Sequence, residues 1–106
     1  MGIDDGTVSE IVRRVLAVSR PERIILFGSA VAGTMTPDSD INLLVVTPHP
    51  TNTVQERLRI WDSLGGLGVP FDVFMIGAEF FEDSKNIFGG IAYPAHKYGR
   101  VIYAAG

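Results

Sequence analysis

The apolar residues near the start of the chain recur at intervals of three and four, which is the spacing of an amphipathic helix. They are Val8, Ile11, Val12, Val15 and Leu16. Thr7 and Glu10 have the T-x-x-E pattern of a capping box, in which each side chain satisfies a backbone N–H group of the first turn. The spacing therefore predicts a helix over residues 7–19, and Pro21 is expected to end it.

Short apolar stretches without this spacing indicate strands. Residues 23–27 are apolar and β-branched, and residues 40–46 begin with polar side chains before an apolar run. Residues 69–76 form a third stretch, with Pro70 at its start, where a strand tolerates the missing N–H group. Buried strands are expected at all three places.

A second helical stripe lies between the last two of these strands. Its members are Val54, Leu58, Trp61 and Leu64. Thr53 and Glu56 repeat the capping-box pattern, and Gly65 and Gly66 are expected to end the helix. The stripe is expected to face the core, with Trp61 buried in it.

The last third of the chain has a weaker pattern. A short helix is expected near 78–83 and another over 85–98, kinked or broken at Pro94. Residues 100–104 fit an edge strand. The order of helices and strands predicts an α/β (α+β) fold, in which helices pack on a small mixed β-sheet.

The composition fits a single globular domain over residues 1–106. Hydrophobic residues make up 46% of the chain and charged residues 20%, a balance that argues against disorder. The formal net charge of −3 gives no attraction toward nucleic acid or an anionic membrane. The chain has no cysteine, no signal-peptide pattern and no apolar run near the roughly 20 residues that span a bilayer. We therefore expect a cytoplasmic protein with no membrane contact and no direct nucleic-acid binding.

The first predicted strand runs into Gly28 and Ser29. Glycine lets the backbone turn tightly and approach a ligand closely, and the small residues that follow can begin a helix. The start of a helix presents unpaired N–H groups that suit a phosphate, although a Gly-Ser turn alone is more often structural. Further along, Asp38 follows Pro37 and is expected to form a turn rather than to bind a ligand.

Polar residues begin the second predicted strand and interrupt the third. Side chains alternate across a strand, so Asp40 and Asn42 point to one face while Ile41 points into the core. Asp72 lies in a strand that is otherwise free of charge, where a carboxylate needs a partner. If the two strands are neighbours, these three polar side chains converge. Oxygen ligands of this kind suit Mg²⁺, although Asn42 also fits a polar strand end that caps a turn.

Taken together, these motifs resemble the minimal nucleotidyltransferase family of the DNA polymerase beta-like nucleotidyltransferase superfamily. The resemblance rests on L-F-G-S at 26–29, a glycine at 33, S-D-I-N-L-L-V-V at 39–46 and P-F-D-V-F-M-I at 70–76. The stretch I-A-Y-P-A-H-K-Y-G-R-V-I-Y at 91–103 is also similar to the family's closing helix and final G-x-x-x-Y segment. The combination of a G-S pair, a D-x-D pair and a later single Asp is far more specific than any one part.

The resemblance implies a role for each matching residue. Gly28 and Ser29 would hold the triphosphate of a nucleotide. The catalytic residues would be Asp40, which binds Mg²⁺, and Asp72, which completes the metal site and helps to deprotonate the acceptor hydroxyl. Position 42 corresponds to the second Asp of the D-x-D motif, so the metal site of this chain would consist of Asp40, Asn42 and Asp72.

The implied activity is the transfer of a nucleoside monophosphate from an NTP, with ATP expected, to a hydroxyl. Family members of this size commonly act as the antitoxin partner of a HEPN-type ribonuclease toxin, and some modify a toxin tyrosine with AMP. Asn42 offers one neutral oxygen in place of a carboxylate, so impaired turnover is expected while nucleotide binding is retained. The alternative is a non-catalytic nucleotide-binding or partner-binding module that neutralises its toxin by contact. Catalytic activity and the formation of a homo-oligomer both stay open on the sequence.

Overall fold

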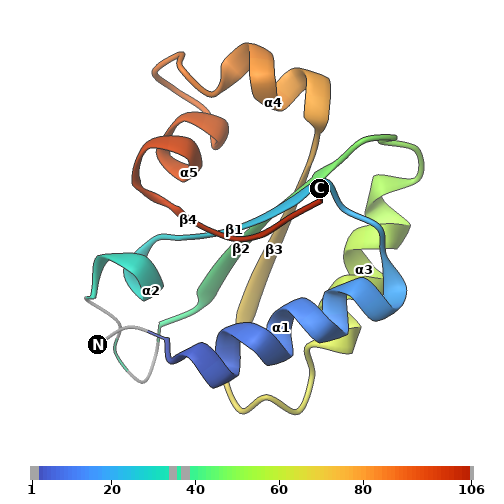
Figure 1. The fold of residues 1–106 in the computed structure, drawn as a ribbon, viewed down its shortest axis with the longest axis vertical. Helices are drawn as coiled ribbons and strands as arrows, with labels where there is room; N and C mark the ends of the chain where they lie inside the picture. The colour runs from blue at the N-terminus through green and yellow to red at the C-terminus, as the bar shows by residue number, and fades with distance from the viewer. Residues whose placement is uncertain (1–2, 34–35, 37–38, 106) are drawn as a thin grey trace.

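The computed structural model describes residues 3–33, 36 and 39–105 (Figure 1). Its elements are α1 (Asp5–Val18), β1 (Arg23–Phe27), α2 (Ser29–Ala32), β2 (Ile41–Thr47), α3 (Thr53–Ser63), β3 (Phe71–Gly77), α4 (Ala78–Ser84), α5 (Ala92–Tyr98) and β4 (Arg100–Ala104). Over these residues, no helix is both long and apolar enough to cross a membrane. The turn predicted at Pro37 and Asp38 lies outside the described residues.

The four strands form one mixed sheet in the order β3-β2-β1-β4. β1 is antiparallel to both β2 and β4, whereas β2 and β3 are parallel and are connected through α3. The end of β1 and the beginnings of β2 and β3 therefore meet at one end of the sheet. The predicted mixed sheet is confirmed, and the stretch at 100–104 is an edge strand, as predicted.

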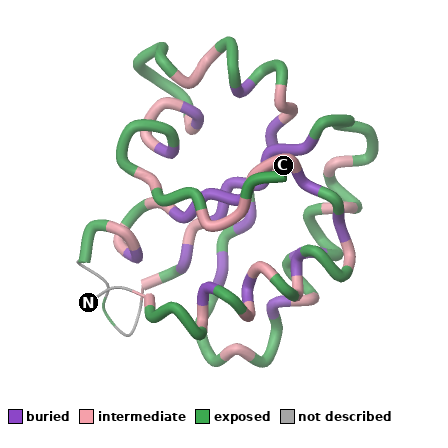
Figure 2. Tube along the Cα trace, viewed as in Figure 1, coloured by how far each residue is buried: buried purple, intermediate pink, exposed green. Residues whose placement is uncertain are grey.

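Helices cover both faces of the sheet: α1 and α3 lie on one face, and α4 and α5 lie on the other (Figure 1). Successive strand residues alternate between the two faces. Ile24, Leu43 and Val73 pack on the α1/α3 side, whereas Ile25 and Leu44 pack on the α4/α5 side. The central strands are thus buried on both faces (Figure 2), which explains why their sequences are almost continuously apolar.

α1 begins earlier than the capping-box pattern predicts. Asp4 is the N-cap, and its carboxylate accepts a hydrogen bond of 2.7 Å from the backbone N–H of Thr7. Thr7 therefore lies inside the helix, and Glu10 pairs with Arg13 instead of the helix start. The predicted capping box was wrong because an acidic N-cap three residues earlier already supplies the acceptor.

α3 also lacks its predicted capping box. Its N-cap, Asn52, has a left-handed backbone conformation and makes no side-chain cap. Glu56 instead accepts a hydrogen bond from the hydroxyl of Ser19 at the end of α1. The other end of α3 is held by α1 as well, because the guanidinium of Arg14 donates to the carbonyl oxygen of Gly65 at 2.7 Å. Contacts with α1 therefore position α3 at both ends.

Except for Leu64, the apolar stripe of α3 does not face the core. Ile60 and Leu64 are buried, at 0% and 1% exposed, whereas Trp61 is 54% exposed. Val54 and Leu58 are also exposed and line a pocket with Trp61 next to β3. The predicted burial of Trp61 was wrong because the helix is rotated so that Ile60 meets the sheet.

The predicted helix over 85–98 is much shorter. α4 continues to Ser84, and α5 begins only at Ala92, after two glycines with positive φ at 89 and 90. Pro94 lies in the first turn of α5, where the missing N–H group would have no intrahelical partner. Pro94 therefore fits the start of α5 and does not kink it.

Gly99 brings the end of α5 against β1. A Cβ atom at this position would lie 2.7 Å from Cγ2 of Ile25 and 2.8 Å from the carbonyl oxygen of Leu26. Only glycine leaves room for this approach, although its φ of −80° is ordinary. The approach holds Tyr98, the last residue of α5, close to the end of β1.

Candidate active site

The candidate site begins at the turn that ends β1. Gly28 has a φ of 84° and a ψ of −149°, a conformation that residues with a Cβ atom rarely adopt. Its carbonyl oxygen accepts hydrogen bonds from the N–H groups of Val31 at 3.1 Å and Ala32 at 3.0 Å. α2 begins at Ser29, at the place where the sequence predicts that the small residues can begin a helix. The first N–H groups of this short helix have no partners within it.

Asn42 is the residue of β2 that lies beside this turn. It is opposite Phe27 in the antiparallel register of β1 and β2. Its amide packs against the α-carbon of Gly28, since a Cβ atom there would lie 2.6 Å from Nδ2 of Asn42. Gly28 is therefore required for space as well as for its backbone conformation. The Gly-Ser turn and position 42 form one continuous surface.

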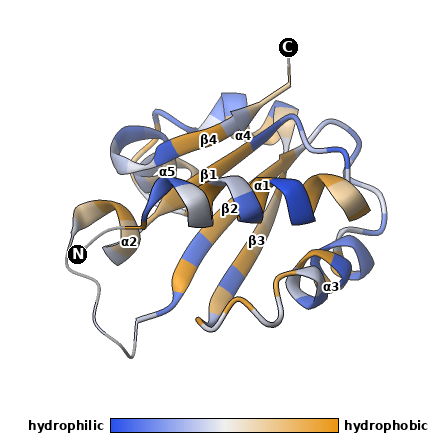
Figure 3. Ribbon diagram, turned by 60° about the horizontal axis from the view of Figure 1, so that its bottom comes forward, coloured by the Kyte–Doolittle hydropathy of each residue, from blue (hydrophilic) through white to orange (hydrophobic). Residues whose placement is uncertain are grey.

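Asp72 lies beside Asn42 on the next strand, because the parallel register of β2 and β3 pairs the two residues. In Figure 3 the beginnings of β2 and β3 carry neighbouring hydrophilic bands in otherwise apolar strands. Asp40 directly precedes β2 and is exposed. Asp72 is exposed, but the protein around it removes part of its hydration, and this desolvation raises its pKa. The charge of Asp40 and a hydrogen bond with it raise that pKa further. The two carboxylates are therefore close enough to interact.

The structure thus brings Gly28, Ser29, Asp40, Asn42 and Asp72 together at one end of the sheet. Two carboxylates and an amide oxygen are hard oxygen donors of the kind that Mg²⁺ takes in proteins. In the part of the chain that the structure describes, no group of three or more His, Cys, Asp and Glu side chains could hold a metal ion. Asp40, Asn42 and Asp72 comprise two carboxylates and one amide, which is one carboxylate short of such a cluster.

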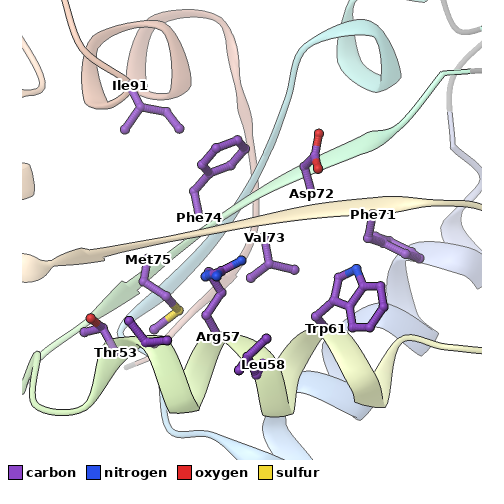
Figure 4. A pocket seen from close by; sticks show the side chains of 11 residues that line it. Thr53, Arg57, Leu58, Trp61, Phe71, Asp72, Val73, Phe74, Met75 and Ile91 are labelled. Atoms are coloured by element: carbon purple, nitrogen blue, oxygen red, sulfur yellow. The ribbon is translucent and has the colours of Figure 1, made fainter.

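Two pockets adjoin this group. One has a volume of about 650 Å³ and is lined by Gly28, Ser29 and Asn42, with Pro94 and Tyr98 of α5 across from them. The other, of about 610 Å³, lies between β3 and α3 and includes Asp72 (Figure 4). We call Asp40, Asn42 and Asp72 the acidic group. Because Asn42 and Asp72 are neighbours in register, this group lies between the two pockets.

Tyr98 was not predicted as a site residue. It is 65% exposed, and the ammonium of Lys97 lies 5.5 Å from the centroid of its ring. An aromatic face and a positive charge therefore lie next to the Gly-Ser turn. The feature of the sequence that could have indicated this arrangement is the glycine directly after Tyr98, because Gly99 allows α5 to approach β1 closely.

A model of the nucleotidyltransferase domain family matches residues 8–89, more than half of the chain. The chain belongs to this family. The match includes the Gly-Ser turn and all three residues of the acidic group, and it ends before α5. A comparison with curated protein sequences gives no match.

Two solved structures have a fold similar to that of this chain. A toxin-antitoxin structure with AMP-PNP superimposes with a TM-score of 0.71 at 16% sequence identity, covering 92% of this chain and 73% of that one. A mutant of the toxin-antitoxin MntA-HpeT superimposes with a TM-score of 0.64 at 15% identity, covering 97% of this chain and 75% of that one. The predicted fold is therefore confirmed, and the family model confirms membership of the nucleotidyltransferase domain family.

Proposed function

We propose that this domain transfers a nucleoside monophosphate from an NTP, with ATP as the expected donor, to a hydroxyl group on a partner protein. The observation that carries the proposal is the convergence of the Gly28–Ser29 turn with Asp40, Asn42 and Asp72. Transfer of a phosphoryl-type group depends on a cradle for the phosphates and on positioned oxygen ligands beside it. The turn would supply the cradle and the three polar side chains would supply the ligands, and all of them lie at the same end of the sheet.

The pocket that contains the turn is the proposed nucleotide site. The first N–H groups of α2 and the hydroxyl of Ser29 would donate to the triphosphate. Tyr98 offers an aromatic face on which a base would stack, and Lys97 adds a positive charge beside it. The pocket volume of about 650 Å³ is in the range of small-molecule sites.

Mg²⁺ is the proposed cofactor. Asp40, Asn42 and Asp72 would hold it through two carboxylates and one amide oxygen. The raised pKa of Asp72 next to Asp40 supports this assignment, because a bound cation would stabilise two negative charges held close together. When bound, Mg²⁺ would stabilise the negative charge that develops on the transferred group.

The proposed transfer uses both pockets. The acceptor oxygen forms a bond to the α-phosphorus, the bond from that phosphorus to the oxygen bridging to the β-phosphate breaks, and pyrophosphate leaves. The hydroxyl proton passes to a carboxylate oxygen of Asp72, which lies in the pocket between β3 and α3. The Gly28–Ser29 turn holds the triphosphate on the opposite side of the acidic group.

The proposed partner is a HEPN-type ribonuclease toxin, for which this chain would be the antitoxin. The likeness in fold to a toxin-antitoxin structure with AMP-PNP supports an antitoxin role that involves a nucleotide. The likeness to the toxin-antitoxin MntA-HpeT points in the same direction. The HEPN assignment itself rests on the resemblance of the sequence motifs to the minimal nucleotidyltransferases.

Asn42 favours a second function, in which the domain binds nucleotide or toxin without catalysis and neutralises the toxin by contact. An amide contributes no negative charge to a metal site, so the ion that activates the acceptor would be held weakly. Under this alternative the pockets and the fold are retained, and only the transfer step is lost.

The test is transfer of labelled AMP from ATP to the purified cognate toxin, with the parent chain compared with Asn42→Asp. Asp has the size of Asn and restores the charge, so we expect the transfer rate to rise by about 10²–10³ while ATP affinity changes much less. Asp72→Asn in the Asn42→Asp background is the control and should abolish the gain. Equal rates well above background would mean that Asn42 is an adequate ligand. Equal inactivity of the parent and Asn42→Asp would favour the contact-only module.

A further inference from the structure

The outer edge of β3 is open over the residues that the structure describes. The sheet order β3-β2-β1-β4 gives β3 a partner on its inner side alone. The backbone N–H and C=O groups on the outer side are therefore available to another strand. An extended peptide commonly binds a protein by adding a strand to such an edge.

α3 forms an apolar wall beside this edge. Val54 is 65% exposed, Leu58 51% and Trp61 54%, and all three line the pocket between α3 and β3. Figure 4 shows Leu58 and Trp61 on α3 below the strand, with Val73 of β3 pointing toward them. The groove that these residues form runs along β3 and is lined by apolar side chains from both elements. Exposed apolar surface of this kind is typical of a binding site.

Arg57 places a positive charge inside this apolar groove. It reaches from α3 toward β3, as Figure 4 shows. Among the described residues, Arg57 makes no ion pair, whereas Arg13, Arg14 and Arg23 each lie near a glutamate. A segment that carries a carboxylate at this point would therefore complement the groove in charge as well as in hydrophobicity.

The groove is continuous with the candidate active site. Asp72 lines it but points to the opposite face of β3 from Val73 (Figure 4). A strand added beside β3 would alternate in the same way, with every second side chain facing α3 and the others facing the Asp72 side. A single bound segment would thus reach both the apolar wall and the acidic group.

We propose that this groove binds an extended segment of the acceptor protein as an additional strand beside β3, an inference that rests on the proposed function. Apolar side chains at alternate positions pack on Leu58 and Trp61, and an acidic side chain among them pairs with Arg57. A hydroxyl-bearing side chain on the other face reaches Asp72. Backbone pairing with β3 fixes the register of the segment and thereby selects which hydroxyl receives the nucleotide.

A second copy of this chain is a poorer occupant of the groove. If β3 of another copy were added in antiparallel orientation, it would present Phe71, Val73 and Met75 on the α3 side. None of these residues carries a charge, so Arg57 would be left without a counter-charge. The charge in the groove therefore favours a different protein over self-association.

The test begins with a phage-displayed library of random peptides selected on the full chain. We expect the enriched peptides to share alternating apolar positions and a carboxylate. Synthetic copies, measured by fluorescence polarisation, should lose affinity by at least about tenfold with Leu58→Glu. Val101→Glu, at an exposed position on the opposite edge strand β4, is the matched control and should bind as the parent does. Bound peptide should slow amide exchange in β3 and leave exchange in β4 unchanged.

A charge exchange tests the role of Arg57. Arg57→Glu should weaken the binding of the acidic peptide by at least about tenfold. Replacing the acidic residue of the peptide with lysine should restore its binding to the Arg57→Glu variant.

Enriched peptides that bind Leu58→Glu as tightly as they bind the parent would overturn the proposal, as would a failure to enrich any peptide. A dimer of the parent that Leu58→Glu dissociates would also overturn it. Binding of Mg²⁺-ATP is measured on the same variants, and a groove that binds peptide in a chain that binds no ATP would refute the proposed function alone.

Discussion

Gly28 and Asn42 restrict each other. The amide of Asn42 occupies the space in which a Cβ atom of residue 28 would lie, 2.6 Å from Nδ2, and the φ of 84° at Gly28 already disfavours any other residue. Asp would fill the same space as Asn42, because the two side chains have the same shape. The residue at position 42 therefore decides the charge of the acidic group without changing its packing.

Asp72 makes the metal-free chain less stable as the pH rises. Partial desolvation and the neighbouring Asp40 raise its pKa in the folded chain, so the folded state binds the proton more tightly than the unfolded state. The resulting stabilisation is complete below the ordinary pKa of Asp, about 4, and is lost as the pH rises through the raised pKa of the folded state. Asp72→Asn is neutral at every pH. Its melting temperature in EDTA should exceed that of the parent at neutral pH, and the difference should vanish at about pH 4.

Circular dichroism during heating measures the melting temperatures of the parent and of Asp72→Asn, and the addition of Mg²⁺ is the control. Added Mg²⁺ should raise the melting temperature of the parent but have little effect on Asp72→Asn, which has lost one of the two negative charges that would hold the ion. Asp83→Asn removes an exposed carboxylate on α4 and should respond to Mg²⁺ as the parent does. A parent that is as stable as Asp72→Asn at neutral pH without metal would contradict this prediction.

At the scale of single elements, the contact between α5 and β1 depends on the absence of one side chain. A Cβ atom at Gly99 would lie 2.7 Å from Ile25 and 2.8 Å from the carbonyl oxygen of Leu26, and that carbonyl belongs to a central strand that cannot shift freely. We expect Gly99→Ala to lower the free energy of unfolding by about 1–3 kcal/mol, as overpacking commonly does. Urea denaturation measures this loss.

Gly6→Ala is the matched control for Gly99→Ala and should have the opposite sign. Gly6 lies in the first turn of α1, and the nearest atom to an added Cβ is the side-chain oxygen of Asp4 at 3.4 Å. Alanine is the better helix former, so a gain of roughly 0.5–1 kcal/mol is expected. A Gly99→Ala variant as stable as the parent would mean that α5 adjusts without cost.

The strands could be predicted from the sequence because the residues of the central strands pack against helices on both faces of the sheet. Leu43, Leu44 and Val45 are all fully buried, since helices cover both faces of the sheet, and a short continuous apolar run between turn signals is typical of such a strand. The orientation of α3 could not be predicted in the same way. Val54 and Leu58 have the spacing of a core stripe, but the same spacing also suits a helix that binds a partner.

In the candidate site, too, some residues could be predicted from the sequence and one could not. Asp40, Asn42 and Asp72 could be predicted because these polar residues precede or interrupt apolar strands, and neighbouring strands bring them together. Tyr98 could not, because its place in the site depends on how a late helix packs on an early strand. Periodicity along the sequence carries no information about that contact.

At the scale of the whole molecule, the proposed nucleotide pocket joins two segments that are distant in the sequence. Ser29 lies in α2, and Tyr98 lies at the end of α5. A nucleotide held between them would stabilise the folded state as a unit. At a concentration about 100 times its Kd, ATP with Mg²⁺ should add about 2.7 kcal/mol to the free energy of unfolding. Differential scanning fluorimetry checks this, ATP without Mg²⁺ should give a smaller shift, and no shift in either condition would exclude nucleotide binding.

The sheet order also determines when the pocket can form during synthesis. β1 lies in the middle of the sheet, yet its neighbour β4 is made last of the four strands, at residues 100–104. At ribosomal speeds the interval between the two strands is on the order of several seconds, and one edge of β1 has no partner during that time. The helix that carries Tyr98 emerges just before β4, so the nascent chain acquires its Gly-Ser turn early and the opposite wall of the pocket late. A nucleotide would then bind chains in which α5 has already packed on β1 in preference to chains that lack α5.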